Sequence, residues 1–157
     1  MKKLYVVGNK ASKSLSPTIF NYWFRKYNIK ASYGYLELTE KNFHNKIKDI
    51  LEKKDTLGLN VTIPFKNKII KHLGKIDTHA KKIGAVNCVT NKKTINGTNT
   101  DWTGYYKTLP NIKQTKNRKV IILGYGGASH AIHYVLKKRG FKDILIFNRS
   151  KKKIKYS

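Results

Sequence analysis

The chain of 157 residues is 39% apolar and 11% aromatic, enough for one domain or two small ones, and this composition excludes a disordered chain. Its formal net charge of +26 comes almost entirely from scattered lysines, and because nucleic-acid readers rely on arginine, a lysine-filled surface is favoured over the alternative, a nucleic-acid binder. The single cysteine, Cys88, excludes an intrachain disulfide and a cysteine-based zinc site. The apolar run before Gly8 is too short for a signal peptide or a membrane span, so we expect a cytoplasmic protein.

Strands and helices alternate through the first 109 residues. Apolar residues recur at strand or helix spacing, and Ser16 followed by Pro17 predicts a helix with Ser16 as its cap. The expected elements, in chain order, are a strand over 2–9, a helix over 16–28, a strand over 31–38, a helix over about 40–53, a strand over 57–63, a helix over 66–73, two short strands within 85–101 joined at 91–93, and a helix from Asp101. This order predicts a parallel or mixed α/β sheet.

The pattern lapses between Pro110 and Arg118, where we place a domain boundary. Beyond it, "KVIIL" predicts a strand, "GYGGAS" a glycine turn, "ASHAIHYVLKK" a helix and "DILIF" another strand, which together make one βαβ unit. A complete dinucleotide-binding domain has about six strands, so only its first part is expected here. The predicted fold class is therefore α/β: a mixed α/β sheet domain at residues 1–110, followed by an incomplete Rossmann-like dinucleotide-binding domain at residues 111–157.

The glycine turn has the composition of a dinucleotide-binding loop. Its glycines let the backbone turn tightly and approach a pyrophosphate, whose charge the N-terminus of the following helix stabilises. A small serine at the third motif position still permits close helix packing. The candidate cofactor-binding residues of the turn are Gly124, Gly126, Gly127, Ala128 and Ser129. The alternative is a glycine-rich turn that binds no ligand.

The end of the last predicted strand indicates which dinucleotide is bound. An NAD site usually carries Asp or Glu there, whereas this chain has "NRSKKK". A 2′-phosphate repels carboxylates and attracts a guanidinium, so NADP is favoured over NAD. The residues expected to contact the cofactor here are Asn148, Arg149, Ser150 and Lys153, with a solvated lysine tail as the alternative.

Small polar residues interrupt apolar patterns at or just past the ends of predicted strands in the first domain. In open α/β sheets the ligand crevice lies outside the carboxyl ends of the strands. Hydroxyls, amides, one lysine and one aspartate together suit a small polyhydroxylated acid. Caps, turns and satisfied strand-end amides are the alternative interpretation of each stretch by itself. The residues concerned are Ser14, Ser16, Asn60, Thr62, Lys66, Asn87, Asn99 and Asp101.

Five stretches in a fixed order resemble shikimate dehydrogenase: "SKSLSP", "NVTIPFK", "GAVNCV", "NTDWTG" and "LGYGGAS" followed by "NRS". The resemblance runs from Tyr5 to about Lys153. It implies NADP-dependent reduction of 3-dehydroshikimate to shikimate, in the pathway to aromatic amino acids. It further implies that Ser14 and Ser16 bind the substrate carboxylate, and that the ring hydroxyls and the reacting carbonyl are held by Thr62, Lys66, Asn87 and Asp101.

The resemblance also implies that Lys66 and Asp101 are the catalytic residues. A lysine beside the reacting carbonyl can give a proton to its oxygen in the reducing direction and take the proton back in oxidation. Asp101 is expected to orient this lysine and a substrate hydroxyl. A surface role for Lys66, one of many lysines, is the alternative.

Two residues depart from the family pattern: Tyr125 stands within the glycine turn, and Trp102 follows "NTD". Neither removes a polar group, so we expect altered packing beside the site. His130 and His133 lack a third ligand nearby, and no metal is expected. Two alternatives remain within the family, namely a quinate/shikimate dehydrogenase that uses NAD and a fragment that binds substrate without turnover. We expect no nucleic-acid or membrane partner, and a homodimer is one candidate assembly.

Overall fold

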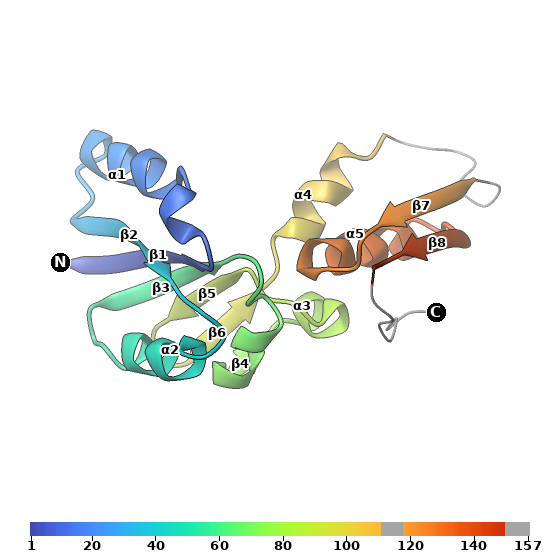
Figure 1. The fold of residues 1–157 in the computed structure, drawn as a ribbon. Helices are drawn as coiled ribbons and strands as arrows, with labels where there is room; N and C mark the ends of the chain where they lie inside the picture. Colours follow the sequence, from blue (N-terminus) through green and yellow to red (C-terminus); the bar gives the residue numbers. More distant parts are fainter. Residues whose placement is uncertain (111–117, 150–157) are drawn as a thin grey trace.

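The computed structural model describes residues 1–110 and 118–149 and contains two separate sheets (Figure 1). The larger sheet has the strand order β2-β1-β3-β5-β6-β4, and the smaller one pairs β7 with β8. The strands are β1 (Lys2–Gly8), β2 (Ala31–Glu37), β3 (Thr56–Val61), β4 (Lys75–Ile76), β5 (Cys88–Asn91), β6 (Ile95–Thr98), β7 (Lys119–Leu123) and β8 (Asp143–Phe147). The α/β fold class predicted from the sequence is confirmed, with a mixed sheet in the first 110 residues.

The pairing of the larger sheet brings four chain segments to one edge. β1 pairs in parallel with both β2 and β3, so the ends of β1 and β3 lie side by side. β5 runs antiparallel to β3 with Cys88 opposite Asn60, and Thr98 at the end of β6 lies opposite Cys88 in turn. Four segments therefore meet at the end of the sheet where β1 and β3 have their carboxyl ends: those after β1, after β3, before β5 and after β6. This end of the strands is called the sheet edge below.

Helices cover both faces of the larger sheet: α1 (Ser16–Lys26) lies on one side and α2 (Phe43–Leu51) on the other (Figure 1). Alternation along β1 explains this, because Val7 packs with the buried face of α2 and Val6 with the aromatic residues of α1. Phe43 of α2 stacks on the buried Phe65 with ring centroids 4.2 Å apart.

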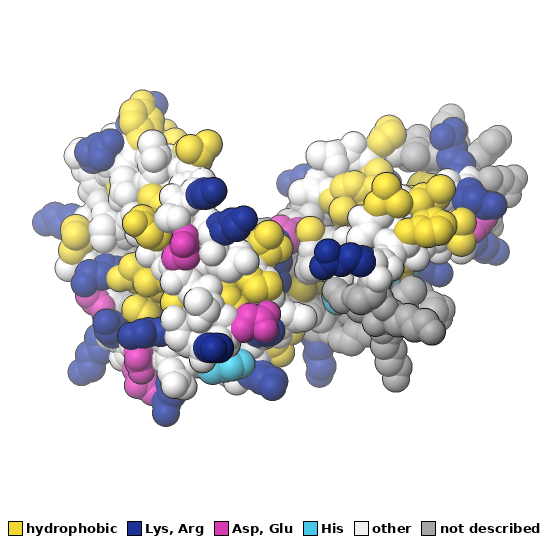
Figure 2. Space-filling model, viewed as in Figure 1, with side chains coloured by type: hydrophobic (Ala, Val, Ile, Leu, Met, Phe, Trp, Pro, Cys, Tyr) yellow, Lys and Arg dark blue, Asp and Glu magenta, His cyan; other side chains and the backbone are white. Residues whose placement is uncertain are grey.

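The smaller sheet is covered on one face by α5 (Gly127–Lys138). Ile122 and Leu136 form the centre of this contact. The opposite face is apolar and exposed, and Figure 2 shows hydrophobic side chains gathered over β7 and β8. The large exposed apolar residues of these strands are Ile121, Leu123, Leu145 and Phe147.

Aromatic side chains connect the two sheets through three helices, α3 (Thr78–Ile83), α4 (Asp101–Thr108) and α5. The ring of Trp102 in α4 stacks on the ring of His79 in α3, with centroids 4.2 Å apart. It meets the ring of Tyr134 in α5 edge-on, with centroids 5.9 Å apart. The Tyr134 hydroxyl lies 2.7 Å from Nδ1 of His79. This arrangement places the start of α5 next to the edge of the larger sheet (Figure 1).

Several predicted boundaries were wrong. Ser16 is the first residue of α1 and not its cap, because the N-cap is Leu15, while the Ser14 hydroxyl accepts a hydrogen bond from the Ser16 backbone N–H. The helix predicted over 66–73 is a short 3-10 helix (Lys68–His72), and α2 is shorter than predicted. The helix α3 was missed, although Asp77 accepts hydrogen bonds from two backbone N–H groups at its start and Gly84 ends it in a left-handed conformation. The two-residue β4 and the 3-10 helix at Ala11–Lys13 were also missed. Within residues 1–110 and 118–149, the helices are all too short or too polar to cross a bilayer.

Candidate functional site

Lys66 sits on a turn that the core holds in place. The turn follows β3 and includes a cis peptide bond between Ile63 and Pro64. Phe65 is fully buried, and the backbone oxygen of Lys66 accepts a hydrogen bond from Val86 N at 2.7 Å. The Lys66 side chain is 12% exposed. The backbone of Lys66 is thus held before the residue by the buried Phe65 and after it by the hydrogen bond to its carbonyl oxygen.

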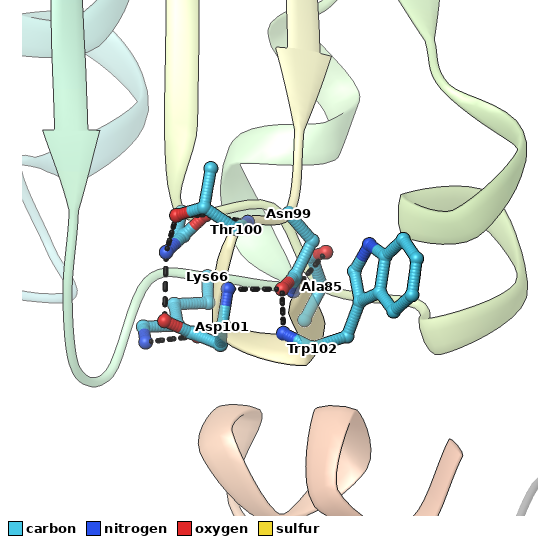
Figure 3. Close-up of polar contacts among 7 residues, drawn as sticks. Lys66, Ala85, Asn99, Thr100, Asp101 and Trp102 are labelled. Carbon is cyan, nitrogen blue, oxygen red and sulfur yellow. Dashed lines mark hydrogen bonds and ion pairs between the residues drawn. The ribbon is translucent and has the colours of Figure 1, made fainter. Parts of the chain in front are cut away.

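Asp101 is the partner of this lysine (Figure 3). Nζ of Lys66 lies 2.7 Å from Oδ2 of Asp101, and the Asp101 side chain is 29% exposed. Oδ1 of the same carboxylate accepts a hydrogen bond from Nδ2 of Asn87 at 2.7 Å. Asp101 begins α4, where the helix dipole favours a negative charge. Both carboxylate oxygens are therefore engaged, one by a cation and one by an amide.

Amide side chains hold the backbone around Asp101 (Figure 3). Asn87 accepts a hydrogen bond from Thr100 N at 2.8 Å, which ties the start of β5 to the start of α4. The buried Asn99 donates to the Ala85 carbonyl at 2.9 Å and accepts from the backbone N–H groups of Asp101 and Trp102. Asn99 therefore stabilises the turn before α4, in agreement with the alternative interpretation of this residue as part of a cap or turn.

A cavity of about 550 Å³ opens at the sheet edge beside Lys66. Its wall includes Ser16, the first residue of α1, and Ser14 two residues before it, with Oγ of Ser14 donating to Oγ of Ser16 at 3.1 Å. Asp101 and Asn99 are not among the residues that line it, but Asp101 contacts two that do, Lys66 and Asn87. The residues predicted from the sequence that line this one cavity are Ser14, Ser16, Asn60, Thr62, Lys66 and Asn87.

Sequence reasoning missed other residues of this site. Lys10 and Lys13 line the cavity as exposed cations. Beneath it, the buried Tyr33 donates a hydrogen bond from its hydroxyl to Oδ1 of Asn60 at 2.6 Å. Burial raises the pKa of Tyr33 to about 12, the charge of Cys88 adds to this, and a hydrogen bond with Ser16 opposes it. The only sequence signal for Tyr33 was its inward position in the alternation of its strand.

A second cavity, of about 440 Å³, lies on the other side of Lys66. Lys66 and Ile63 line both cavities. The other wall is the glycine turn, where Gly124 adopts a φ of +89° that favours glycine. The space next to Gly124 and Gly126 is open, since a Cβ placed on either would meet nothing within 4 Å. The residues that line this cavity are Ile63, Pro64, Lys66, Asn67, Tyr125, Gly126, Gly127 and His130.

Gly127 brings the glycine turn into contact with Lys66. A Cβ on Gly127 would lie 3.1 Å from both Cβ and Cδ of Lys66. The absence of a side chain at Gly127 therefore allows the first turn of α5 to approach the lysine. Ala128 and Ser129 occupy the same first turn.

The remaining predicted cofactor residues lie at the end of β8. Oδ1 of Asn148 accepts a hydrogen bond from Tyr125 N at 3.1 Å and so supports the glycine turn. Arg149 is exposed, and Ser150 and Lys153 lie outside the described residues. Tyr125 is itself buried, with its ring packed on His130 at 4.4 Å.

The Tyr125 hydroxyl lies 3.2 Å from Nδ1 of His133. Tyr125 therefore fills the interior under the turn and leaves the space beside Gly124 and Gly126 open. Burial lowers the pKa of His133. Among the described residues, no three His, Cys, Asp or Glu side chains gather as a metal site would require.

Proteins of known sequence and structure resemble this chain along most of its length. The model of the shikimate dehydrogenase substrate binding domain matches residues 6–89. The shikimate dehydrogenase (NADP(+)) of Pelagibacter ubique is 38% identical over 161 residues, which cover 98% of this chain and 58% of that protein. The structure of shikimate dehydrogenase 1 from Peptoclostridium difficile superposes with a TM-score of 0.87 at 33% identity and covers all of this chain and 59% of that one.

Shikimate 5-dehydrogenase of Thermus thermophilus, solved in complex with NADP(H) and shikimate, gives a TM-score of 0.78 at 26% identity, over 96% of this chain and 57% of that one. The chain thus spans a little more than half the length of these relatives. Since the family model covers more than half of the 157 residues and the relatives align along nearly all of them, this chain belongs to the shikimate dehydrogenase family.

Proposed function

We propose that the protein serves the NADP-dependent reduction of 3-dehydroshikimate to shikimate, a step on the pathway to aromatic amino acids. The observation that carries this proposal is the position of Lys66, which pairs with Asp101 and lines both a polar cavity and a glycine-lined one. A reaction that joins a small polar substrate to a dinucleotide needs its proton donor at such a boundary. The names of the relatives support the same reaction and the same cofactor.

The polar cavity suits shikimate in size and chemistry. The hydroxyls of Ser14 and Ser16 would bind the carboxylate, assisted by the charges of Lys10 and Lys13. Thr62, Asn87 and Asp101 would bind the ring hydroxyls and the region of the reacting oxygen. With Asp101 already oriented by Asn87, the substrate meets preformed partners and little ordering is required on binding.

Lys66 would donate the proton. Nζ carries three hydrogens and one is taken by Asp101 at 2.7 Å, which leaves others for a ketone oxygen in the cavity. The proton from Nζ would go to the ketone oxygen as the ketone carbon gains a hydride, so that together they give the hydroxyl, and the amine left behind regains a proton from the solvent. Asp101 keeps the side chain of Lys66 pointed at the cavity throughout.

The glycine turn fits a dinucleotide. Open space beside Gly124 and Gly126, and the backbone N–H groups at the start of α5, match the needs of a pyrophosphate. Arg149 at the end of β8 would meet a 2′-phosphate. The chemistry that NADPH supplies when bound is a hydride for the ketone carbon.

A second candidate is substrate binding without turnover. The observation in its favour is that the smaller sheet has only two strands within the described residues, against about six in a complete dinucleotide-binding domain. In this case the polar cavity binds shikimate as proposed, while the affinity for NADP is low.

Two separate titrations and one assay test both candidates. Shikimate and NADP⁺ are titrated into the protein by calorimetry, and NADPH oxidation is followed with 3-dehydroshikimate. Binding of both ligands together with turnover supports the first proposal. Saturable shikimate binding with weak NADP⁺ binding and no turnover supports the second. The absence of any shikimate binding contradicts both.

A further inference from the structure

A buried tyrosine hydroxyl lies directly beneath the polar cavity. Tyr33 is 3% exposed and does not line the cavity, yet its hydroxyl donates to Oδ1 of Asn60, which does. The bond is 2.6 Å long and joins β2 to β3 across the sheet. Tyr33 can therefore act on a ligand only through a neighbour.

The surroundings of Tyr33 fix where its hydroxyl lies. Its ring stacks on Phe20 of α1 with centroids 4.6 Å apart and planes within 7° of parallel. The side chain of Asn21 hydrogen-bonds to the Tyr33 backbone on both sides, accepting from N at 2.9 Å and donating to O at 2.8 Å. A clamp on the backbone and a stack on the ring leave the hydroxyl little freedom.

The direction of the hydrogen bond decides which end of the Asn60 amide faces the ligand. The Tyr33 hydroxyl donates its hydrogen to Oδ1 of Asn60, so the amide turns its oxygen toward the tyrosine. No described residue accepts a hydrogen bond from Nδ2 of Asn60, so the amide presents two N–H donors.

Tyr33 also stays a donor across the physiological pH range. Burial raises its pKa to about 12, so the hydroxyl keeps its hydrogen at neutral pH. It is therefore suited to hold an orientation and unsuited to exchange protons with a substrate.

We infer that Tyr33 is a positioning residue: it fixes the Asn60 amide with its N–H groups toward the polar cavity, as donors to an oxygen acceptor of the ligand. The inference rests on the proposed function, because it adds to the recognition of shikimate in that cavity. Without the hydroxyl, the Asn60 amide can turn and present its oxygen, which repels an acceptor.

The test is a double-mutant cycle on shikimate affinity, measured by calorimetry. Tyr33→Phe keeps the ring and its stack on Phe20 while removing the hydroxyl. Asn60→Ala removes the amide. Tyr35→Phe is the matched control, because Tyr35 lies on the same strand with its side chain 53% exposed. Melting temperature and NADP⁺ affinity are measured on every variant, since a general loss of structure would lower both.

We expect Tyr33→Phe to weaken shikimate binding about tenfold, with unchanged NADP⁺ affinity and no change for Tyr35→Phe. In the Asn60→Ala background, Tyr33→Phe should cost no further affinity, because the residue through which it acts is gone. Wild-type affinity in Tyr33→Phe would overturn the inference alone, as would an equal loss in both backgrounds. A wild-type protein that binds no shikimate would overturn the proposed function and this inference together.

Discussion

Nζ of Lys66 lies 2.7 Å from Oδ2 of Asp101, although 35 residues separate them in the chain. The β5–β6 hairpin accounts for this, because it leaves the sheet edge near Asn87 and returns to it at Thr98. The amides of Asn87 and Asn99 then lock the returning segment in place. The ion pair is thus a product of sheet register, and a change in the hairpin would separate the two charges.

Replacement of Lys66 by alanine separates catalysis from binding. We expect kcat for 3-dehydroshikimate reduction to fall at least about 100-fold with KM within a few-fold of wild type, because a positioned proton donor acts chiefly in the transition state. Lys68→Ala is the control, since Lys68 pairs with Glu40 at 2.9 Å and lines neither cavity. If turnover is absent in the wild type, shikimate affinity alone is compared. A rise in KM at unchanged kcat would make Lys66 a binding residue only.

Much of this site could be predicted because it depends on strand ends. The apolar alternation of β1 and β3 predicted ends at residues 9 and 63, close to the observed ends at Gly8 and Val61, and parallel pairing brings such ends together. The predicted α/β class is confirmed for this reason. The roles given to Ser14, Thr62 and the other site residues stay predictions, as does the domain boundary at 110–118.

The remainder depends on tertiary packing that one sequence does not record. Tyr33 shares its pattern with any inward-facing strand residue, and only the folded sheet, in which β1 lies between β2 and β3, shows that its hydroxyl meets Asn60. The approach of Gly127 to Lys66 depends on how α4 and α5 pack, which Trp102 and Tyr134 determine. The helix α3 was missed because its six residues hold too few apolar positions for a period to be visible.

Adjacent glycines of the turn should respond differently to alanine. In Gly127→Ala the new Cβ lies 3.1 Å from the Lys66 side chain, which Asp101 holds, so we expect shikimate affinity to fall roughly fivefold. In Gly126→Ala the Cβ meets nothing within 4 Å and shikimate affinity should be unchanged. The same Cβ occupies space that a pyrophosphate needs, so NADP⁺ affinity should fall about tenfold or more. Equal effects of both variants on shikimate would contradict the contact with Lys66.

The two tryptophans offer a test of the junction between the sheets. Trp102 is half-buried between His79 and Tyr134, whereas Trp23 is 45% exposed on α1. We expect Trp102→Ala to lower the free energy of unfolding by about 2 to 3 kcal/mol, as deletion of a partly buried aromatic ring does. Trp23→Ala should cost less than about 1 kcal/mol. Urea denaturation measures both, and an equal cost would show that the Trp102 contacts add nothing to stability.

His72 should make stability fall as the pH drops below about 6.5, the ordinary pKa of a histidine. Burial lowers its pKa below 6.5, and the charges of His44, 2.8 Å away, and of Lys71 add to this effect. Below pH 6.5 the unfolded chain therefore binds the proton more readily than the folded one, so stability is full above that pH and falls as the pH drops toward the folded-state pKa. His133, whose pKa burial also lowers, contributes in the same direction. His72→Gln should reduce the loss of melting temperature between pH 7.5 and 5.5 without abolishing it, and His44→Gln should reduce it less, because burial remains. A variant that loses as many degrees as the wild type over this interval would exclude His72 as a source of the pH dependence.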